Sequence, residues 1–325
     1  MTSWNFDEVP SQLGRTAIVT GANSGIGFAA ARMLARKGAS VVLACRDPQK
    51  GANALQGIRA ENPIGAVTLE ALDLADFDSV AAFAQHFAAN HDCVDLLINN
   101  AGVMIPPLGR TRQDHELQFG TNHLGHFALT ARLLPLLEAT PAARIVVVSS
   151  SAQNIGRIDF DDLDWRQRPY RPWLAYGQSK LANMLFALEL QRRLTASGSA
   201  LKVTASHPGW TSTDLVRTAG FLSFLGPLLG MTPDEGALTT LRAATDPTAE
   251  GGSYWGPAGI TGMSGPPDRA QACSAARDEA VAARLFDESE RLTGVSFAFR
   301  GVIATPRAPP RACTDSARPP SRSAS

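Results

Sequence analysis

The feature that most constrains the fold is a glycine-rich turn between an apolar segment and a helix-forming segment. Residues 15–20 are apolar and β-branched, residues 21–27 form the turn, and residues 28–37 have helical spacing. A second, near-continuously apolar segment follows at 39–44. Such strands are typical of a parallel sheet that is covered on both faces. The order strand, helix, strand predicts a right-handed β–α–β unit.

Three glycines in this turn have separate expected tasks. Gly21 permits the tight turn, Gly25 lets the backbone approach a pyrophosphate, and Gly27 lets the helix pack against the strand. The helix N-terminus then offers N–H groups and the positive end of its dipole to phosphates. Any tight β–α turn can use such glycines, but the position between strand and helix favours a dinucleotide site.

The strand–helix pattern repeats along the chain. Further strands are predicted at 66–72, 94–98, 143–148 and 201–206. Each is followed by polar residues, as expected at the carboxyl edge of a sheet where ligands bind. The fold class is therefore predicted as α/β, a Rossmann-type doubly wound parallel sheet in a single domain over residues 1–299.

The end of the chain differs in composition. Residues 300–325 are rich in Pro, Arg, Ala and Ser and contain one acidic residue, Asp315. Few apolar residues are present to offset the entropy of ordering, so this tail is predicted to be disordered. We expect a dispensable tail in preference to a basic tether for an acidic partner.

The residue after the second strand bears on cofactor choice. An NAD site usually has an acidic residue about 20 residues beyond the glycine turn. This chain has Arg46 there, and a guanidinium suits the 2′-phosphate of NADP. Asp47 follows directly and could pair with Arg46 or contact the ribose. NADP is therefore favoured, and NAD is the weaker alternative.

Tyr176 and Lys180 form the most informative pair of reactive side chains. They lie four residues apart in a segment of helical spacing, so they share one face of a helix. A fixed cation nearby favours tyrosinate and lowers the pKa of the phenol. The pair is thus suited to proton transfer with a carbonyl or an alcohol. A solvated Lys on an exposed helix is the alternative explanation.

Composition excludes several other classes. The 325-residue chain has a formal net charge of 0, so no overall field favours nucleic acid. The 4 Cys and 6 His lack metal-ligand spacing, so no metal site is predicted. The N-terminal residues do not resemble a signal peptide, and no segment is apolar enough to cross a bilayer. We expect a cytoplasmic location.

Several short motifs follow one another along the chain. They are Thr20-Gly21-Ala22-Asn23-Ser24-Gly25-Ile26-Gly27, Asn99-Asn100-Ala101-Gly102, Asn122, Ser150, Tyr176 with Lys180, and Pro208-Gly209. Together they resemble the short-chain dehydrogenase/reductase family. Residues 43–46, 121–127, 158–163 and 174–183 resemble its retinol-dehydrogenase-like branch, which also contains the WW-domain oxidoreductase. The similarity spans roughly residues 10–297.

The resemblance implies roles for individual residues. Tyr176 would be the general acid/base, Lys180 would lower its pKa and hold the nicotinamide ribose, Ser150 would hydrogen-bond the substrate oxygen, and Asn122 would anchor a water in a proton relay. Ser149 and Ser151 are the less favoured alternatives to Ser150. The implied cofactor-binding residues are Gly21, Asn23, Ser24, Gly25, Ile26, Gly27, Arg46, Asp73, Leu74, Asn99, Ala101, Gly102, Tyr176, Lys180, Pro208, Gly209 and Thr213.

The resemblance also implies a function. It indicates an NADP-dependent oxidoreductase that interconverts an alcohol and an aldehyde or ketone, with a small apolar substrate that is retinoid-, steroid-, lipid- or polyketide-like. A C=C reductase of the protochlorophyllide-reductase type and a catalytically idle NADP-sensing or scaffolding protein are the alternatives. The segment 221–231 matches the substrate lid, or else a dimer contact in a homo-oligomer. The insert 159–173 is expected over one edge of the site.

Overall fold

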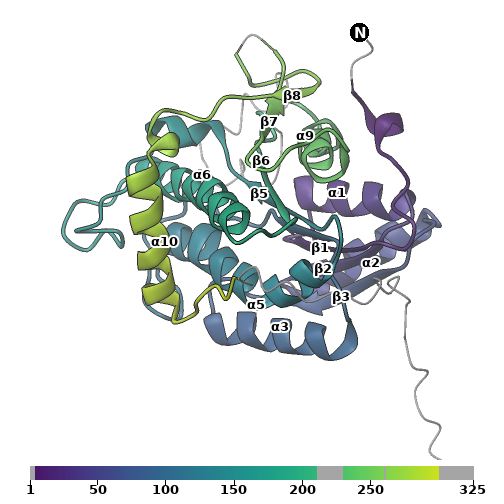
Figure 1. Cartoon of the computed structure of the whole chain (residues 1–325), viewed down its shortest axis with the longest axis horizontal. Helices are drawn as coiled ribbons and strands as arrows, with labels where there is room; N and C mark the ends of the chain where they lie inside the picture. Colours follow the sequence, from purple (N-terminus) through teal and green to yellow (C-terminus); the bar gives the residue numbers. More distant parts are fainter. Residues whose placement is uncertain (1–3, 211–229, 260, 300–325) are drawn as a thin grey trace, which may run out of the picture.

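One twisted sheet with helices on both faces forms the body of the protein (Figure 1). The structure is a computed structural model, and it describes residues 4–210, 230–259 and 261–299. The strand order is β3-β2-β1-β4-β5-β6-β7-β8, and all neighbours are parallel except β7 and β8. The strands are β1 (Thr16–Thr20), β2 (Ser40–Cys45), β3 (Val67–Ala71), β4 (Leu96–Asn99), β5 (Arg144–Val148), β6 (Lys202–Ser206), β7 (Tyr254–Pro257) and β8 (Pro267–Arg269).

The helices form two layers that cover the sheet (Figure 1). One layer contains α1, α2 and α9, and the other contains α3, α5, α6 and α10. The predicted doubly wound α/β architecture is confirmed. The helices are α1 (Gly25–Arg36), α2 (Pro48–Ala60), α3 (Phe77–Asn90), α4 (Leu117–Phe119), α5 (Gly125–Ala139), α6 (Pro172–Ala196), α9 (Pro233–Thr245) and α10 (Glu279–Thr293), with a π-helical turn η2 (Gly120–Leu124) and short 3-10 turns η1 (Phe6–Glu8), η3 (Ser151–Ile155) and η5 (Ala275–Arg277).

The strands separate two apolar cores because successive side chains point to opposite faces. Ile18 in β1 faces the core under α3, α5, α6 and α10, whereas Val19 faces the core under α1, α2 and α9. Both residues are fully buried. This two-sided burial explains why the central strands are apolar throughout and do not alternate with polar residues.

The C-terminal part of the sheet shows where sequence patterns were weak. No prediction was made for β7, β8 or α10. The two strands are short and contain Pro and Gly, so they have no recognisable strand pattern. The start of α9 did carry a signal. Thr232 caps this helix, Pro233 is its first residue, and Glu235 completes a capping box with Thr232.

The insert at 159–173 packs beside α4 and α6. Arg168 pairs with Asp159 at 3.0 Å, donates to the side chain of Gln178 in α6 at 2.8 Å, and lies over the ring of Trp165. The insert is therefore anchored to the helix that carries Tyr176.

Three expectations concern residues outside the described ranges. They are the role of Thr213, most of the segment 221–231, and the tail 300–325. Across residues 4–210, 230–259 and 261–299, no helix combines the length and apolar character that a membrane crossing requires.

We predict that α10 is an integral part of the core. The ring of Phe286 is 2% exposed and lies 5.0 Å from that of Phe127 and 4.9 Å from that of Phe297. Phe286→Ala should lower the free energy of unfolding by about 3–5 kcal/mol, because it leaves a cavity. Leu13→Ala, at a side chain 67% exposed, should change it by less than about 0.5 kcal/mol. Urea denaturation measures both, and equal midpoints would show that α10 packs only loosely.

Candidate active site

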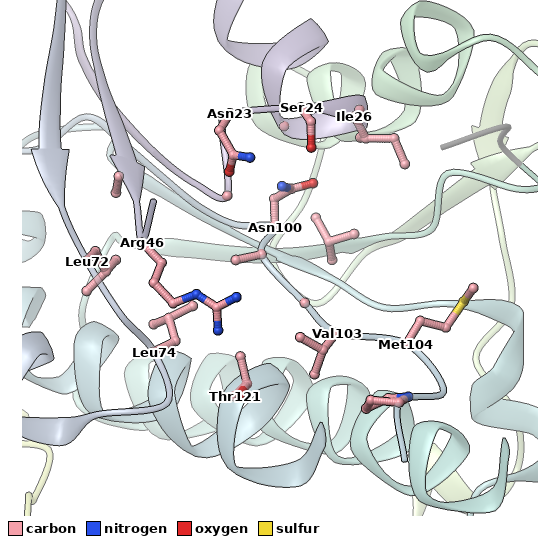
Figure 2. A pocket seen from close by; sticks show the side chains of 18 of the residues that line it. Asn23, Ser24, Ile26, Arg46, Leu72, Leu74, Asn100, Val103, Met104 and Thr121 are labelled. Carbon is pink, nitrogen blue, oxygen red and sulfur yellow. The ribbon is translucent and has the colours of Figure 1, made fainter. Parts of the chain in front are cut away.

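A pocket of about 600 Å³ lies at the carboxyl ends of the central strands (Figure 2). It runs from the glycine turn after β1, past the end of β2, to the helix α6. Most of the residues predicted from the sequence meet in it. These are Gly21, Asn23, Ser24, Gly25, Ile26, Gly27, Arg46, Asp73, Leu74, Ala101, Gly102, Tyr176, Lys180 and Pro208.

The N-terminus of α1 fits a phosphate group. The side chain of its N-cap residue, Ser24, makes no capping hydrogen bond, and no acidic residue lies in the first turn. In α2 and α3, by contrast, Asp47 and Asp76 cap the helix with their carboxylates. The N–H groups of α1 therefore open into the pocket without a side-chain partner, as an anion site requires.

A close contact explains the glycine at the start of this turn. Gly21 has φ +67°, and a Cβ added to it would lie 2.9 Å from the Cα of Ala101. The hydroxyl of Thr20 accepts hydrogen bonds from the backbone N–H groups of Asn100 and Ala101, at 2.9 and 3.0 Å. The turn after β1 and the loop after β4 are thus held together as one floor of the pocket.

Asn99 and Asn100 have different surroundings. Asn99 is the last residue of β4, does not line the pocket, and donates from its amide to Thr130 at 2.9 Å. Asn100 lines the pocket and also donates to the carbonyl of Thr20 at 2.8 Å. The cofactor contact was expected of Asn99, whereas Asn100 is the residue of the pair that lines the pocket. Successive side chains of a strand point to opposite sides, so Asn99 and Asn100 could not both be expected to face the pocket.

The guanidinium of Arg46 extends into the pocket beside Leu74 (Figure 2). Asp47 turns to α2, where its carboxylate accepts hydrogen bonds from the backbone N–H groups of Gln49 and Lys50, both at 3.0 Å. The ammonium of Lys50 lies 3.9 Å from Asp47 and also lines the pocket. Lys50 is thus a second cation at this end of the pocket, one that was not predicted from the sequence.

Tyr176 and Lys180 are both buried on α6. The ammonium of Lys180 lies 5.7 Å from the centre of the Tyr176 ring and donates to the carbonyl of Val148 at 3.1 Å. Burial lowers the pKa of Lys180 to about 8. Burial also raises the pKa of Tyr176 to about 12, against a lowering by its hydrogen bond with Ser150. The depression expected from Lys180 is not among the causes of this pKa shift, which desolvation dominates.

Ser150 is placed against Tyr176 by the backbone. Its side chain caps η3 by accepting from the N–H of Ala152 at 3.2 Å. A Cβ on Gly156, at the end of η3, would collide with the carbonyl of Gly177. This close approach brings the turn after β5 against α6, one residue beyond Tyr176.

The two neighbouring serines have other partners. Ser149 donates to the carbonyl of Lys180 at 2.8 Å, and Ser151 donates to the sulfur of Met263 at 3.9 Å. Of the three serines, Ser150 is the one whose hydrogen bond lowers the pKa of Tyr176. Ser149 lines the pocket, and the role expected of Ser150 at the substrate oxygen stays a prediction.

Asn122 lies in the π-helical turn, a type of helix distortion that often occurs at functional sites. Its side chain accepts from the N–H of Val103 at 2.8 Å and donates to the carbonyl of Val103 at 3.0 Å and to Ser179 at 2.9 Å. Its backbone carbonyl accepts from His126 at 2.9 Å. The water relay expected of Asn122 stays a prediction.

Comparison with known proteins gives consistent relatives. A model of the family "short chain dehydrogenase" matches residues 15–220. Retinol dehydrogenase 13 of Homo sapiens is 44% identical over 293 residues, which cover 87% of this chain and 85% of that protein. Polyprenol dehydrogenase of Mus musculus is 42% identical over 299 residues, which cover 88% of this chain and 86% of that protein.

Solved structures agree with the fold. A crystal structure of an uncharacterized protein from Mycobacterium Paratuberculosis has a TM-score of 0.78 and 44% identity, and covers 91% of this chain and 99% of its own. A short chain dehydrogenase from Shigella flexneri 2a, solved in complex with NADP, has a TM-score of 0.60 and 27% identity, and covers 76% of this chain and 97% of its own.

We predict that the buried Lys180 costs stability. Its folded pKa of about 8 lies below the ordinary 10.5, so between these values the unfolded chain binds more protons and stability rises with pH. Lys180→Met should therefore stabilise the cofactor-free protein at pH 7 by on the order of 2–3 kcal/mol and remove this rise. Urea denaturation from pH 7 to 10.5 measures both effects.

Lys50→Met is the matched control, because the side chain of Lys50 is 70% exposed. It should leave the stability and its pH dependence nearly unchanged. If Lys180→Met is less stable than the unmodified protein at pH 7, the burial of its charge is not the dominant effect.

Proposed function

Because the chain belongs to the short-chain dehydrogenase family, in its retinol-dehydrogenase-like branch, and is an oxidoreductase acting on CH–OH or C=O groups, we propose that it uses NADP to interconvert an apolar alcohol and its carbonyl compound. The observation that carries this proposal is that Tyr176, which is hydrogen-bonded to Ser150, lines one pocket together with Lys180, the glycine turn and Arg46.

The side chains divide the chemistry with the cofactor. A bound nicotinamide would supply or accept the hydride. Tyr176, with a pKa raised to about 12, is protonated at neutral pH and can give its proton to a carbonyl oxygen during reduction. The hydroxyl of Ser150 can stabilise charge that develops on the same oxygen. In the oxidative direction, the positive charge of Lys180 favours the tyrosinate form of Tyr176.

The charges near the end of β2 support NADP over NAD. Two cations, Arg46 and Lys50, line the pocket there. Asp47, which follows Arg46 in the sequence, uses its carboxylate to cap α2 and to pair with Lys50. Asp47 could have contacted the ribose of NAD or paired with Arg46. Its carboxylate already has other partners, which weakens both of these alternatives. A guanidinium and an ammonium together suit a 2′-phosphate.

Exposed apolar side chains support an apolar substrate. Ile155, Trp173 and Leu174 are 53%, 40% and 39% exposed. Trp173 and Leu174 lie in the first turn of α6, just before Tyr176, and Ile155 packs against Gly177. These three side chains do not line the pocket, but they lie around the part of α6 that carries Tyr176, and exposed apolar side chains that lie together are typical of a binding site. The names of the relatives, which refer to retinol and polyprenol, point to substrates of the same character. A cytoplasmic location stays a prediction.

We predict that Arg46 selects the cofactor. Arg46→Asp should weaken NADPH binding by about tenfold or more, because charge-assisted hydrogen bonds to a phosphate are lost, while NADH binding is retained or improved. Lys50→Ala should have a smaller effect in the same direction. Lys37→Ala, a charge change outside the pocket, should leave both affinities unchanged. Fluorescence titration at fixed salt measures the affinities, and an unchanged NADPH-to-NADH ratio in Arg46→Asp would refute the assignment.

We predict that Tyr176→Phe lowers kcat by about a hundredfold or more, because the proton donor is lost, and leaves the affinity for NADPH within about threefold. The assay follows NADPH consumption with apolar aldehydes of increasing chain length. Longer aldehydes should have lower KM values, because they bury more apolar surface. The absence of carbonyl-dependent NADPH consumption in the unmodified protein would favour an idle NADP-sensing protein or a C=C reductase.

A further inference from the structure

The wall of the pocket contains a strained residue. Ile105 has φ +55°, in the left-handed region, and it lines the pocket. This backbone conformation is rare for any β-branched residue. The next residue is Pro106, and a proline disfavours helical conformations in the residue before it. Such strain persists only where surrounding contacts hold it, and it is concentrated at functional sites.

Gln118 supplies a contact that holds Ile105. Its side chain is buried, and its Oε1 accepts from the backbone N–H of Ile105 at 2.9 Å. Its Nε2 donates to the hydroxyl of Tyr170 and to the carbonyl of Pro172, both at 2.9 Å. Pro172 is the first residue of α6, one turn before Tyr176. The side-chain amide of Gln118 thus joins the pocket wall to the start of α6.

Asn122, one helical turn further along, makes the same kind of connection. It joins Val103 in the wall to Ser179 in α6, and Ser179 in turn donates to the carbonyl of Tyr176 at 2.8 Å. Gln118 and Asn122 are therefore two parallel amide links between the wall at 103–105 and α6. Side chains four residues apart lie on one face of a helix, which accounts for this arrangement.

The orientation of Gln118 is itself fixed by its neighbours. Glu116 accepts hydrogen bonds from the N–H groups of Gln118 and Phe119, at 3.0 and 2.7 Å, and from the hydroxyl of Tyr170 at 3.0 Å. Glu116 and Gln118 are both 0% exposed. A buried network in which each polar atom has a partner is rigid and defines one geometry.

We propose that Gln118 is a positioning residue for the reaction: it holds Ile105 in its left-handed conformation and thereby sets the distance between the pocket wall and Tyr176. This inference rests on the proposed function. It assigns to Gln118 a larger effect on the reaction at Tyr176 than on the affinity for the dinucleotide, because Gln118 joins Ile105 to the start of α6 and does not itself line the pocket.

The first test replaces Gln118 with Leu, which keeps the volume and removes all three hydrogen bonds. We expect kcat/KM for an apolar aldehyde to fall about tenfold or more, while the affinity for NADPH changes less than about twofold. An equal loss of NADPH affinity, or an unchanged kcat/KM, would overturn the proposal, because a purely structural role would not separate the two quantities.

The second test is a rescue at the strained residue. Glycine adopts φ > 0 without cost, whereas alanine does not. In the Gln118→Leu background, Ile105→Gly should recover kcat/KM at least about threefold relative to Ile105→Ala. The alanine variant is the matched control, since both changes remove the isoleucine side chain beyond Cβ. Equal values for the two double variants would contradict a role through the backbone of Ile105.

The third test does not depend on turnover. Amide hydrogen exchange of Ile105 should be about tenfold faster in Gln118→Leu, while the amide of Val103, which is bonded to Asn122, exchanges as in the unmodified protein. If the unmodified protein reduces no carbonyl, the proposed function fails, and this measurement still decides whether Gln118 holds Ile105. Unchanged exchange at Ile105 would overturn the positioning role.

A milder variant covers the case in which Gln118→Leu does not fold. Tyr170→Phe removes one of the two acceptors of the Gln118 amide. It should accelerate exchange at Ile105 and lower kcat/KM about twofold to fivefold, with unchanged NADPH affinity. If both quantities match those of the unmodified protein, the link between this network and the pocket wall is refuted.

Discussion

The active site depends on the burial of one positive charge. The ammonium of Lys180 lies inside the protein between the end of β5 and the ring of Tyr176, and it donates to the carbonyl of Val148. Desolvation disfavours this charge and lowers its pKa, while the same desolvation keeps Tyr176 protonated. In the proposed function Lys180 would hold the nicotinamide ribose as well as act on Tyr176, so cofactor binding and proton transfer would be coupled through one side chain.

The burial of Lys180 depends on the rigid packing of the sheet and the helices around it. The two apolar cores fix the sheet and its covering helices, and the polar connections between them bring the reactive groups together. The hydroxyl of Thr20 joins the loops after β1 and β4, and the amide of Asn122 joins the wall at Val103 to α6. Each connection joins segments far apart in the sequence, which is the usual way in which an open α/β sheet assembles a site at its carboxyl edge.

Sequence patterns predicted the structure correctly where it depends on a short stretch of neighbouring residues. Apolar segments predicted the central strands, and the spacing of Tyr176 and Lys180 predicted their shared helix face. The patterns were insufficient where several segments determine the environment. The pKa of Tyr176 depends on burial as well as on Lys180, the carboxylate of Asp47 is directed by its helix cap, and the task of Gln118 is visible only once Ile105 and Pro172 lie beside it.

The contact between Gly156 and Gly177 has a consequence for how the site responds to temperature. There the two backbones meet without side chains between them. Side chains hop among rotamers as a protein warms, but a contact between two main chains has no rotamers to populate. The spacing of Ser150 and Tyr176 should therefore follow the integrity of α6 itself, so that catalytic alignment is lost together with the fold and not gradually before it.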